Sequence, residues 1–186
     1  MVYMSTNIQQ ELLALLDYAH GRLNGQLKDM SNDEYLWEPV PGCWSVRPGE
    51  DGVFRAEKTY PDPQPAPFTT IAWRLWHIGG DCLLSYSDRF FEGTDRDVRE
   101  WPGTVTGGAE ELNREWARFR AHVASLDDDA MAGRLGPTAG RYADDSYHAL
   151  VLHALDEVIH HTAEIGVLRD LYRHRRPDGS LLASPA

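Results

Sequence analysis

The chain has 186 residues, of which 42% are hydrophobic, and its formal net charge is −11. This length fits one ordinary domain. Because a division would leave two small cores, we predict a single domain over residues 1–186. Proteins that bind nucleic acid or an anionic membrane surface usually do so with positive side chains that neutralise phosphates, and the acidic balance of this chain argues against both classes. We therefore expect neither a nucleic-acid partner nor a membrane partner.

The cysteines and the apolar runs indicate the cellular compartment of the protein. No apolar run approaches the roughly 18–20 residues that span a bilayer, and the first residues lack the basic and apolar regions of a secretory signal. The two cysteines, Cys43 and Cys82, lie far apart and form no CxxC pair. A disulfide framework is therefore excluded, and we predict a cytoplasmic protein in a reducing environment.

The first third of the chain combines an amphipathic helix with an irregular segment. Residues 5–27 are expected to be helical because leucines recur every three or four residues, and Ser5 or Thr6 can cap the start. Residues 37–68 hold seven of the eleven prolines, a density that forbids a helix, although a short hairpin fits around residues 50–52.

The proline-rich segment 37–68 has two possible roles. A loop of this length is often a lid or one wall of a pocket. It is equally well explained as a packing strap that is held by its aromatic side chains, which are Trp37, Trp44, Phe54 and Tyr60.

Three further helices are expected over residues 69–92, 108–126 and 146–173. Thr69 or Thr70 begins the first of them and Gly93 stops it, while the last ends in a basic cluster that suits a helix C-terminus. The predicted fold class is all-α: an antiparallel four-helix bundle in which the proline-rich segment forms a long crossover between helices one and two. Such bundles build ligand and metal sites from side chains that point into the core.

The last predicted helix carries a polar centre on a stripe that is apolar at both ends. The stripe contains Glu157, His161 and Glu164 between leucine and alanine positions. A buried carboxylate is costly unless it has a partner. Glu157 and His161 are four residues apart, so their side chains can converge on one ion, as in many helical zinc sites. This pair alone is also common on solvated helix faces, and a second stripe through Val158 competes for the core.

The second predicted helix supplies a further histidine. His77 lies in the largely apolar turn Trp76-His77-Ile78-Gly79. A lone histidine there is more often a hydrogen-bonded core residue than a metal ligand. Two features favour a ligand: Gly79 and Gly80 are poor helix formers that can leave space beside a site, and Asp81 lies four residues on, where it can orient the imidazole.

These residues resemble the DinB-like metal-binding bundles, which include the YfiT-type and thiol-dependent transferases. The resemblance covers most of the chain. It is carried by the pair Trp44-Ser45, by the His77 turn, and by residues 156–165, which read Asp-Glu-Val-Ile-His-His-Thr-Ala-Glu-Ile. Many members have His-x3-His in this last run, whereas Glu157 replaces the first histidine here. That variant is similar to the mycothiol-dependent maleylpyruvate isomerases.

The resemblance implies that His77, Glu157 and His161 are three metal ligands. Two histidines and one carboxylate leave open positions for water or substrate, which is typical of reactive sites. Zinc is the first choice of metal, and nickel, cobalt or iron would also be accepted. In the thiol-dependent members the metal holds a low-molecular-weight thiol as the thiolate nucleophile, which implies a thiol cofactor, mycothiol, and a small-molecule substrate.

The remaining polar residues of the two helices have open roles. Glu164 can accept a hydrogen bond from a ligand histidine, act as a base, or pair with Arg169, and with Asp81 it is the candidate for a catalytic residue. His153 can be a pocket wall or a substitute ligand, and His160 is expected at the surface. The aromatic set is expected to be chiefly core, with one or two members lining a pocket; it comprises Trp73, Trp76, Trp101, Trp116 and Tyr142.

Three functions remain compatible with these features. The first is a metal-dependent enzyme, a thiol-cofactor transferase or isomerase. The second is a non-catalytic bundle that binds a metal or small ligand in a stress response, because fold alone does not assign a reaction. The third is a structural helical dimer in which the three residues form a hydrogen-bonded cluster. Helix faces left apolar after core packing lead us to expect a homodimer.

Overall fold

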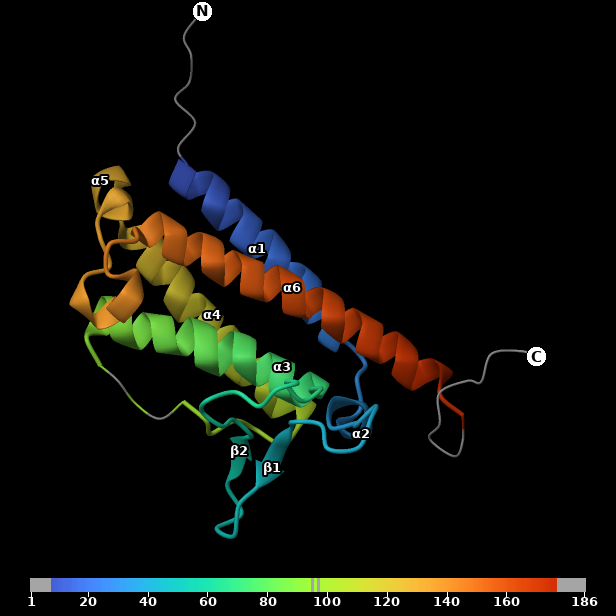
Figure 1. The fold of residues 1–186 in the computed structure, drawn as a ribbon. Helices are drawn as coiled ribbons and strands as arrows, with labels where there is room; N and C mark the ends of the chain where they lie inside the picture. The colour runs from blue at the N-terminus through green and yellow to red at the C-terminus, as the bar shows by residue number, and fades with distance from the viewer. Residues whose placement is uncertain (1–7, 95, 97, 177–186) are drawn as a thin grey trace, which may run out of the picture.

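The computed structural model describes residues 8–94, 96 and 98–176 (Figure 1). The protein is mostly helical, and a small β-hairpin projects from one end of the helices (Figure 1). The main helical segments are α1 (Ile8–Leu27), the continuous run of α3 (Ile71–Trp76), η1 (His77–Leu84) and η2 (Ser87–Glu92), α4 (Val105–Ser125) and α6 (Tyr147–His174). The shorter elements are α2 (Asn32–Tyr35), β1 (Val46–Pro48), β2 (Phe54–Ala56), α5 (Asp128–Ala132) and η3 (Pro137–Tyr142).

The long helices form two parallel pairs that run in opposite directions. Within one pair, Gln26 near the end of α1 contacts Gly166 of α6. In the other pair, Arg118 and His122 near the end of α4 bond to Glu92 at the end of η2. The two pairs are antiparallel to each other, as the bond between Gln9 at the start of α1 and the Val123 carbonyl near the end of α4 illustrates.

This topology corrects two details of the predicted bundle. The helices are not all antiparallel to their neighbours in sequence, because α4 runs in the same direction as the α3 segment. The crossover that this requires lies between the end of η2 and the start of α4, where the Val98 carbonyl accepts from Trp76 Nε1 at 2.7 Å near the start of the α3 segment. The proline-rich segment joins helix ends that lie at the same end of the bundle. The all-α prediction also omits the hairpin of β1 and β2, whose place around residues 50–52 was expected.

Side-chain caps fix the helix starts. Thr70, Thr104 and Ser146 each accept a hydrogen bond from the backbone N–H three residues on. The predicted bounds of the second and fourth helices agree with the structure to within two residues, and Gly93 ends η2 in the left-handed conformation. Helix α4 begins three residues before the predicted start. The predicted caps Ser5 and Thr6 lie outside the described residues.

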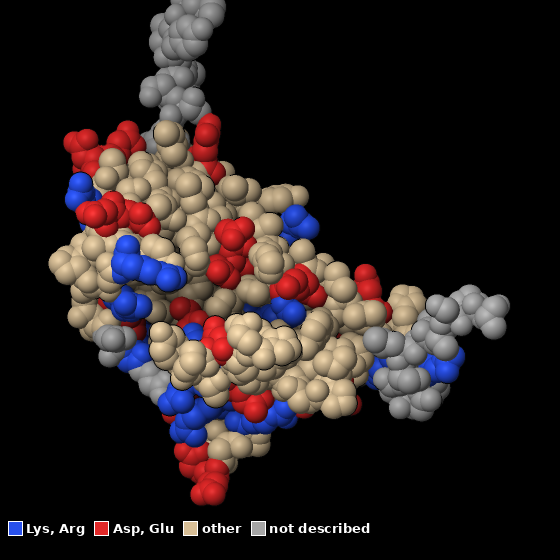
Figure 2. Space-filling model, in the orientation of Figure 1, with Lys and Arg blue, Asp and Glu red and all other residues tan. Residues whose placement is uncertain are grey.

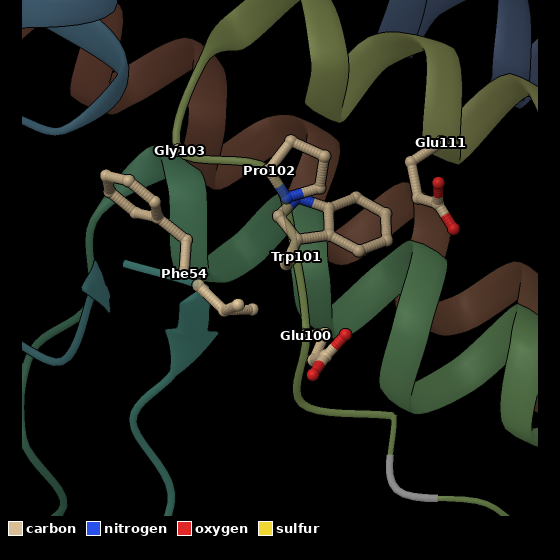
Figure 3. A pocket seen from close by; sticks show the side chains of 7 residues that line it. Phe54, Glu100, Trp101, Pro102, Gly103 and Glu111 are labelled. Carbon is tan, nitrogen blue, oxygen red and sulfur yellow. The ribbon is translucent and has the colours of Figure 1, made fainter. Parts of the chain in front are cut away.

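The hairpin is held by the segment that precedes α4. The backbone N–H of Ala56 donates to the Arg99 carbonyl at 2.8 Å, and that of Trp101 donates to the Phe54 carbonyl at 3.1 Å. Figure 3 shows the Phe54 ring beside Gly103, where an added Cβ would come within 2.4 Å of the ring. Gly103 is therefore required for this close packing.

The proline-rich segment is anchored at several points over the N-terminal half of the α3 segment. Trp44 pairs with the backbone of Thr69 and its ring lies 5.9 Å from that of Trp73, while Ser45 Oγ bonds to the capping hydroxyl of Thr70. Tyr60, one of the four expected anchors, is 97% exposed and holds nothing. The segment is thus anchored as expected for a strap, and it also forms a wall, since Phe54 lines a hollow and Glu57 and Lys58 reach the site described below.

The core of α6 draws on both candidate stripes. Val151, Leu155, Val158 and Ile165 of the second stripe are buried, and so are Leu150, Ala154 and Leu168 at the apolar ends of the first. Glu157, His161 and Glu164 lie at the edge of this core, with side chains 22%, 12% and 35% exposed. The polar stripe therefore faces the α3 segment from the rim of the bundle, where solvent has access. Among the described residues, no helix is long and apolar enough to cross a membrane.

The first prediction concerns the glycine pair after His77. A Cβ at Gly79 would lie 2.3 Å from the buried ring of Trp101, and one at Gly80 would lie 2.8 Å from the Trp76 ring. Gly79→Ala should therefore lower the free energy of unfolding by about 1–3 kcal/mol, measured by urea denaturation. Gly21→Ala is the control, since an alanine there meets open space on an exposed helix face and should stabilise by about 0.5–1 kcal/mol. Equal effects of the two changes would contradict the packing argument.

Candidate metal centre

Three side chains from two helices meet at the rim of the bundle. His77 stands at the start of η1, where the α3 segment widens into π-helical turns, and Glu157 and His161 stand one turn apart on α6. Glu157 Oε2 lies 3.1 Å from His77 Nε2 and 3.2 Å from His161 Nε2. The two imidazole rings are perpendicular, with centroids 4.9 Å apart.

This arrangement fits a divalent metal ion. The three candidate ligand atoms all lie within 4.8 Å of one another. In a tetrahedral zinc site with bonds of about 2.0–2.1 Å, neighbouring ligand atoms are roughly 3.3 Å apart, close to the separations of Glu157 Oε2 from the two imidazole nitrogens. Two imidazole nitrogens and one carboxylate oxygen are also the donor types that zinc and related transition metals accept. The three ligands predicted from the sequence are therefore brought together.

Each histidine has a carboxylate beside its other nitrogen. Asp81 Oδ2 lies 3.1 Å from His77 Nδ1, which is a close charge contact although Nδ1 has no partner at hydrogen-bonding geometry. Glu164 Oε2 lies 2.5 Å from His161 Nδ1. Carboxylates in this position orient a metal-binding imidazole and raise its basicity. Both predicted catalytic candidates thus contact a ligand histidine on the side away from the other ligands.

Both carboxylates are in turn held by a cation. Lys58 from the proline-rich segment bonds to the two oxygens of Asp81 at 2.9 and 2.8 Å. The buried guanidinium of Arg74 pairs with Glu164 Oε2 and lies 3.4 Å from His161 Nδ1. Arg169, the partner considered for Glu164, instead pairs with the buried Glu34 at 2.7 Å. That alternative was wrong because Arg169 points toward α2.

The charges of the cluster determine how protons distribute over it. Burial alone would lower the pKa of His77, but Asp81 and Glu157 outweigh it and raise the pKa to about 9. Hydrogen bonds from His161 and His77 hold the pKa of Glu157 well below its usual range. Burial lowers the pKa of His161, with the charge of His77 acting in the same direction. Without a metal, the shifts of Glu157 and His77 both favour a charged contact between these two side chains.

Aromatic packing fixes the first ligand ring. The Trp73 indole stacks on the His77 imidazole, with centroids 5.1 Å apart and planes 10° apart. Its Nε1–H donates to the Glu57 carbonyl at 2.7 Å, which joins this ring to the proline-rich strap. His77 therefore has little freedom to rotate, and a pre-ordered ligand loses less entropy on binding.

The structure also places the glycines, the cysteine and the other histidines that lie near the three candidate ligands. Gly79 and Gly80 do not open space beside the site, because Trp101 and Trp76 fill it. Cys82 is buried, and burial raises its pKa. His160 is exposed as predicted, and its Nε2 lies 3.3 Å from Glu164. His153 lies in a pocket wall.

Sequence reasoning missed the cations Arg74 and Lys58. Arg74 precedes His77 by three residues, so helical spacing could have placed it on the same face. Lys58 could not have been found this way, because its position depends on the course of the irregular strap.

The surface around the centre carries both signs of charge. On the described part of the face drawn in Figure 2, lysines and arginines form small groups interspersed with acidic side chains rather than a continuous basic stripe. A separate hollow of about 350 Å³ lies between the hairpin and the start of α4, lined by Phe54, Trp101 and two glutamates, Glu100 and Glu111 (Figure 3). It contains none of the three candidate ligands.

Comparison with known proteins identifies the family. Residues 15–165 match the sequence profile of the DinB superfamily. The chain belongs to the DinB superfamily. Its fold is similar to a crystal structure described as that of a conserved protein from Enterococcus faecalis, with a TM-score of 0.55 and 13% identity over 89% of this chain and 96% of that one. None of the curated proteins matches the chain. At 13% identity, the similarity between the two structures shows a shared fold and nothing about function.

The second prediction tests the carboxylate behind His161. Glu164→Gln keeps the size of the side chain but removes the charge that faces His161 Nδ1 and Arg74. The zinc affinity should fall about 10- to 100-fold, measured by competition with a chromophoric chelator. Asp156→Asn, on the exposed side of the same helix, is the matched control and should leave the affinity unchanged. An unaltered affinity in Glu164→Gln would show that this contact does not support the ligand.

Proposed function

We propose that this DinB-superfamily protein is an enzyme that depends on a divalent metal ion held by His77, Glu157 and His161. The observation that carries the proposal is the convergence of two imidazole Nε2 atoms on one carboxylate oxygen, at 3.1 and 3.2 Å. Two further features support a reactive rather than a structural site. The ligands are partly exposed, so a substrate can reach the ion. Three protein ligands also leave one coordination position open.

The residues around the centre have three different roles: they bind the ion, orient the ligands, and neutralise charge. His77 and His161 would hold the ion through Nε2, while Asp81 and Glu164 keep both rings oriented through Nδ1. Arg74 neutralises Glu164 and so limits the negative charge that faces an incoming anion. Bound there, a divalent ion supplies Lewis acidity, which stabilises a thiol as its thiolate or lowers the pKa of water.

The finer assignment is a thiol-dependent transferase or isomerase. It is supported by Glu157, because many DinB-like bundles have histidine at this position, whereas glutamate is similar to the variant in the mycothiol-dependent maleylpyruvate isomerases. Zinc is the proposed metal because its ligand preferences match the set, and mycothiol is the proposed thiol. The alternative is a bundle that binds a metal or a small ligand without turnover, for example in a stress response.

The third prediction is the metal content of the purified protein. Protein expressed without an affinity tag should contain about one transition metal ion per chain by inductively coupled plasma mass spectrometry. His77→Ala and His161→Ala should each lose it, because two ligands hold zinc far more weakly than three. His160→Ala, an exposed histidine of the same helix, is the control and should keep the metal. A metal-free wild type after incubation with zinc and nickel would leave only a hydrogen-bonded polar cluster.

The fourth prediction separates an enzyme from a binding protein. The metal-loaded protein should either isomerise maleylpyruvate with mycothiol regenerated, or convert an aryl halide and mycothiol into a thioether and halide, and His161→Ala should be at least 100-fold slower. Isomerisation is followed by the change in substrate absorbance, and thiol consumption in the halide reaction with a free-thiol reagent. Tight metal binding with no thiol-dependent turnover for any substrate would favour the non-catalytic alternative.

We also propose that the protein is a homodimer. Side chains of α1 and α6 form an exposed apolar groove on the face away from α4, with Leu15, Tyr18 and Ile159 43%, 65% and 42% exposed. Exposed apolar patches of this kind commonly mark interfaces, and a second copy would pair the same helices about a twofold axis.

The fifth prediction concerns this interface. Ile159→Glu should convert a dimer into a monomer in light scattering coupled to size-exclusion chromatography, because the charge would be buried without a partner. Val53→Glu places the same charge at an exposed valine of the hairpin, outside the groove, and should remain dimeric. A wild type that is monomeric at all concentrations would refute the dimer.

A further inference from the structure

A cavity of about 300 Å³ lies between η2, η3 and the start of α6. Its walls are mostly aromatic and aliphatic, and they include Tyr86, Phe90, Tyr142, Ala149, Leu150 and His153. We call this space the α6 cavity. It shares no residue with the three candidate metal ligands, and nothing in the proposed metal chemistry explains why it exists.

Two contacts join the α6 cavity to the metal centre. The Tyr86 hydroxyl and His153 Nδ1 are hydrogen-bonded at 2.9 Å, and His153 Nε2 lies 3.6 Å from Glu157 Oε1. Glu157 Oε2, the other oxygen of the same carboxylate, faces the two ligand histidines. One carboxylate thus separates the cavity from the position of the ion, and a molecule in the cavity would extend toward the centre past the imidazole of His153.

The polarity of the walls changes along this direction. Tyr86 and His153 are the polar wall residues connected to Glu157, whereas Phe90, Ala149 and Leu150 provide apolar surface. At the rim, Arg89 and Asp145 carry opposite charges, and Arg89 donates to the Thr138 carbonyl at 2.9 Å. The cavity therefore offers no net charge to select an ionic group, and it fits an apolar body whose polar end points toward the metal.

The volume limits the size of that body. An enclosed apolar cavity of about 150 Å³ is enough to bind benzene. The α6 cavity has about twice this volume and lies at the lower end of the range of small-molecule sites. One aromatic ring with a short linker, or a branched alkyl group of similar size, would fill it.

We propose that the α6 cavity binds the apolar body of the substrate or thiol whose reactive atom binds the metal. This inference rests on the proposed metal-dependent function and adds the class of ligand: a small molecule with an uncharged aromatic or branched aliphatic group next to its metal-binding atom. Tyr142, which is half-exposed, and Ala149 determine how large this group can be.

The test compares two thiols on the cobalt-loaded protein. Ethanethiol and 2-phenylethanethiol have the same metal-binding atom, and only the second carries a ring that reaches the cavity. Their dissociation constants are measured from the thiolate-to-cobalt charge-transfer absorption. The phenyl compound should bind about 10- to 100-fold more tightly, since this is the gain expected for burying an aromatic ring.

Two variants locate that preference in the cavity. Ala149→Leu fills the space and should reduce the difference between the thiols to about threefold or less, without changing the affinity for ethanethiol. Tyr142→Ala removes one wall and should weaken only the phenyl compound. Its control is Tyr60→Ala, an exposed tyrosine of the proline-rich segment outside the cavity, which should bind both thiols as the wild type does. Circular dichroism and the unfolding midpoint verify that each variant is folded.

The outcomes separate failure of the cavity from failure of the metal site. Equal affinities for both thiols in the wild type, or a preference that survives Ala149→Leu and Tyr142→Ala, would overturn the cavity proposal and leave the metal site intact. If cobalt does not bind, the proposed function fails. The cavity is then judged on the metal-free protein with 2-phenylethanol, which should shift the methyl resonances of Ala139 and Ala149; unchanged resonances at millimolar concentration would overturn it.

Discussion

The contact of Glu157 with two imidazoles is the interaction around which the other features of the site are arranged. Its Oε2 atom lies within 3.2 Å of nitrogens from α6 and from the α3 segment, so it joins two antiparallel helices at the rim of the bundle. A carboxylate at this depth needs positive partners or a metal. The stacked Trp73, the outer carboxylates and their cations all serve to keep the two imidazoles directed at it.

Much of the site could be predicted because it depends on short-range periodicity. Residues four apart on a helix lie on one face, so the spacing indicated that Glu157 and His161 can converge, and the resemblance to DinB-like bundles paired them with His77. The helix bounds were also predictable, since capping residues such as Thr70 and Ser146 act within three residues of their own position. The DinB superfamily match over residues 15–165 confirms the family that these residues indicated.

The parts that could not be predicted depend on contacts between distant segments. The long crossover was assigned to the proline-rich segment because of its length, whereas the chain returns to the start of the α3 segment after η2, where Val98 contacts Trp76. How deeply the polar centre of the first α6 stripe is buried depends on how closely α1 and the α3 segment approach α6. Gly79 and Gly80 looked like space beside a ligand, yet each accommodates a tryptophan ring from the core. In each case the sequence shows the residue types, but it does not show which distant residues they contact in the folded protein.

The central claim is that one divalent ion binds between these three side chains, and anomalous diffraction from a zinc-loaded crystal tests it most directly. The account predicts a single strong peak at the zinc edge, about 2.0–2.2 Å from His77 Nε2, His161 Nε2 and a Glu157 oxygen. A map with no peak at this position, and with Glu157 still hydrogen-bonded to both imidazoles, would contradict it and identify the cluster as a structural contact between α6 and the α3 segment.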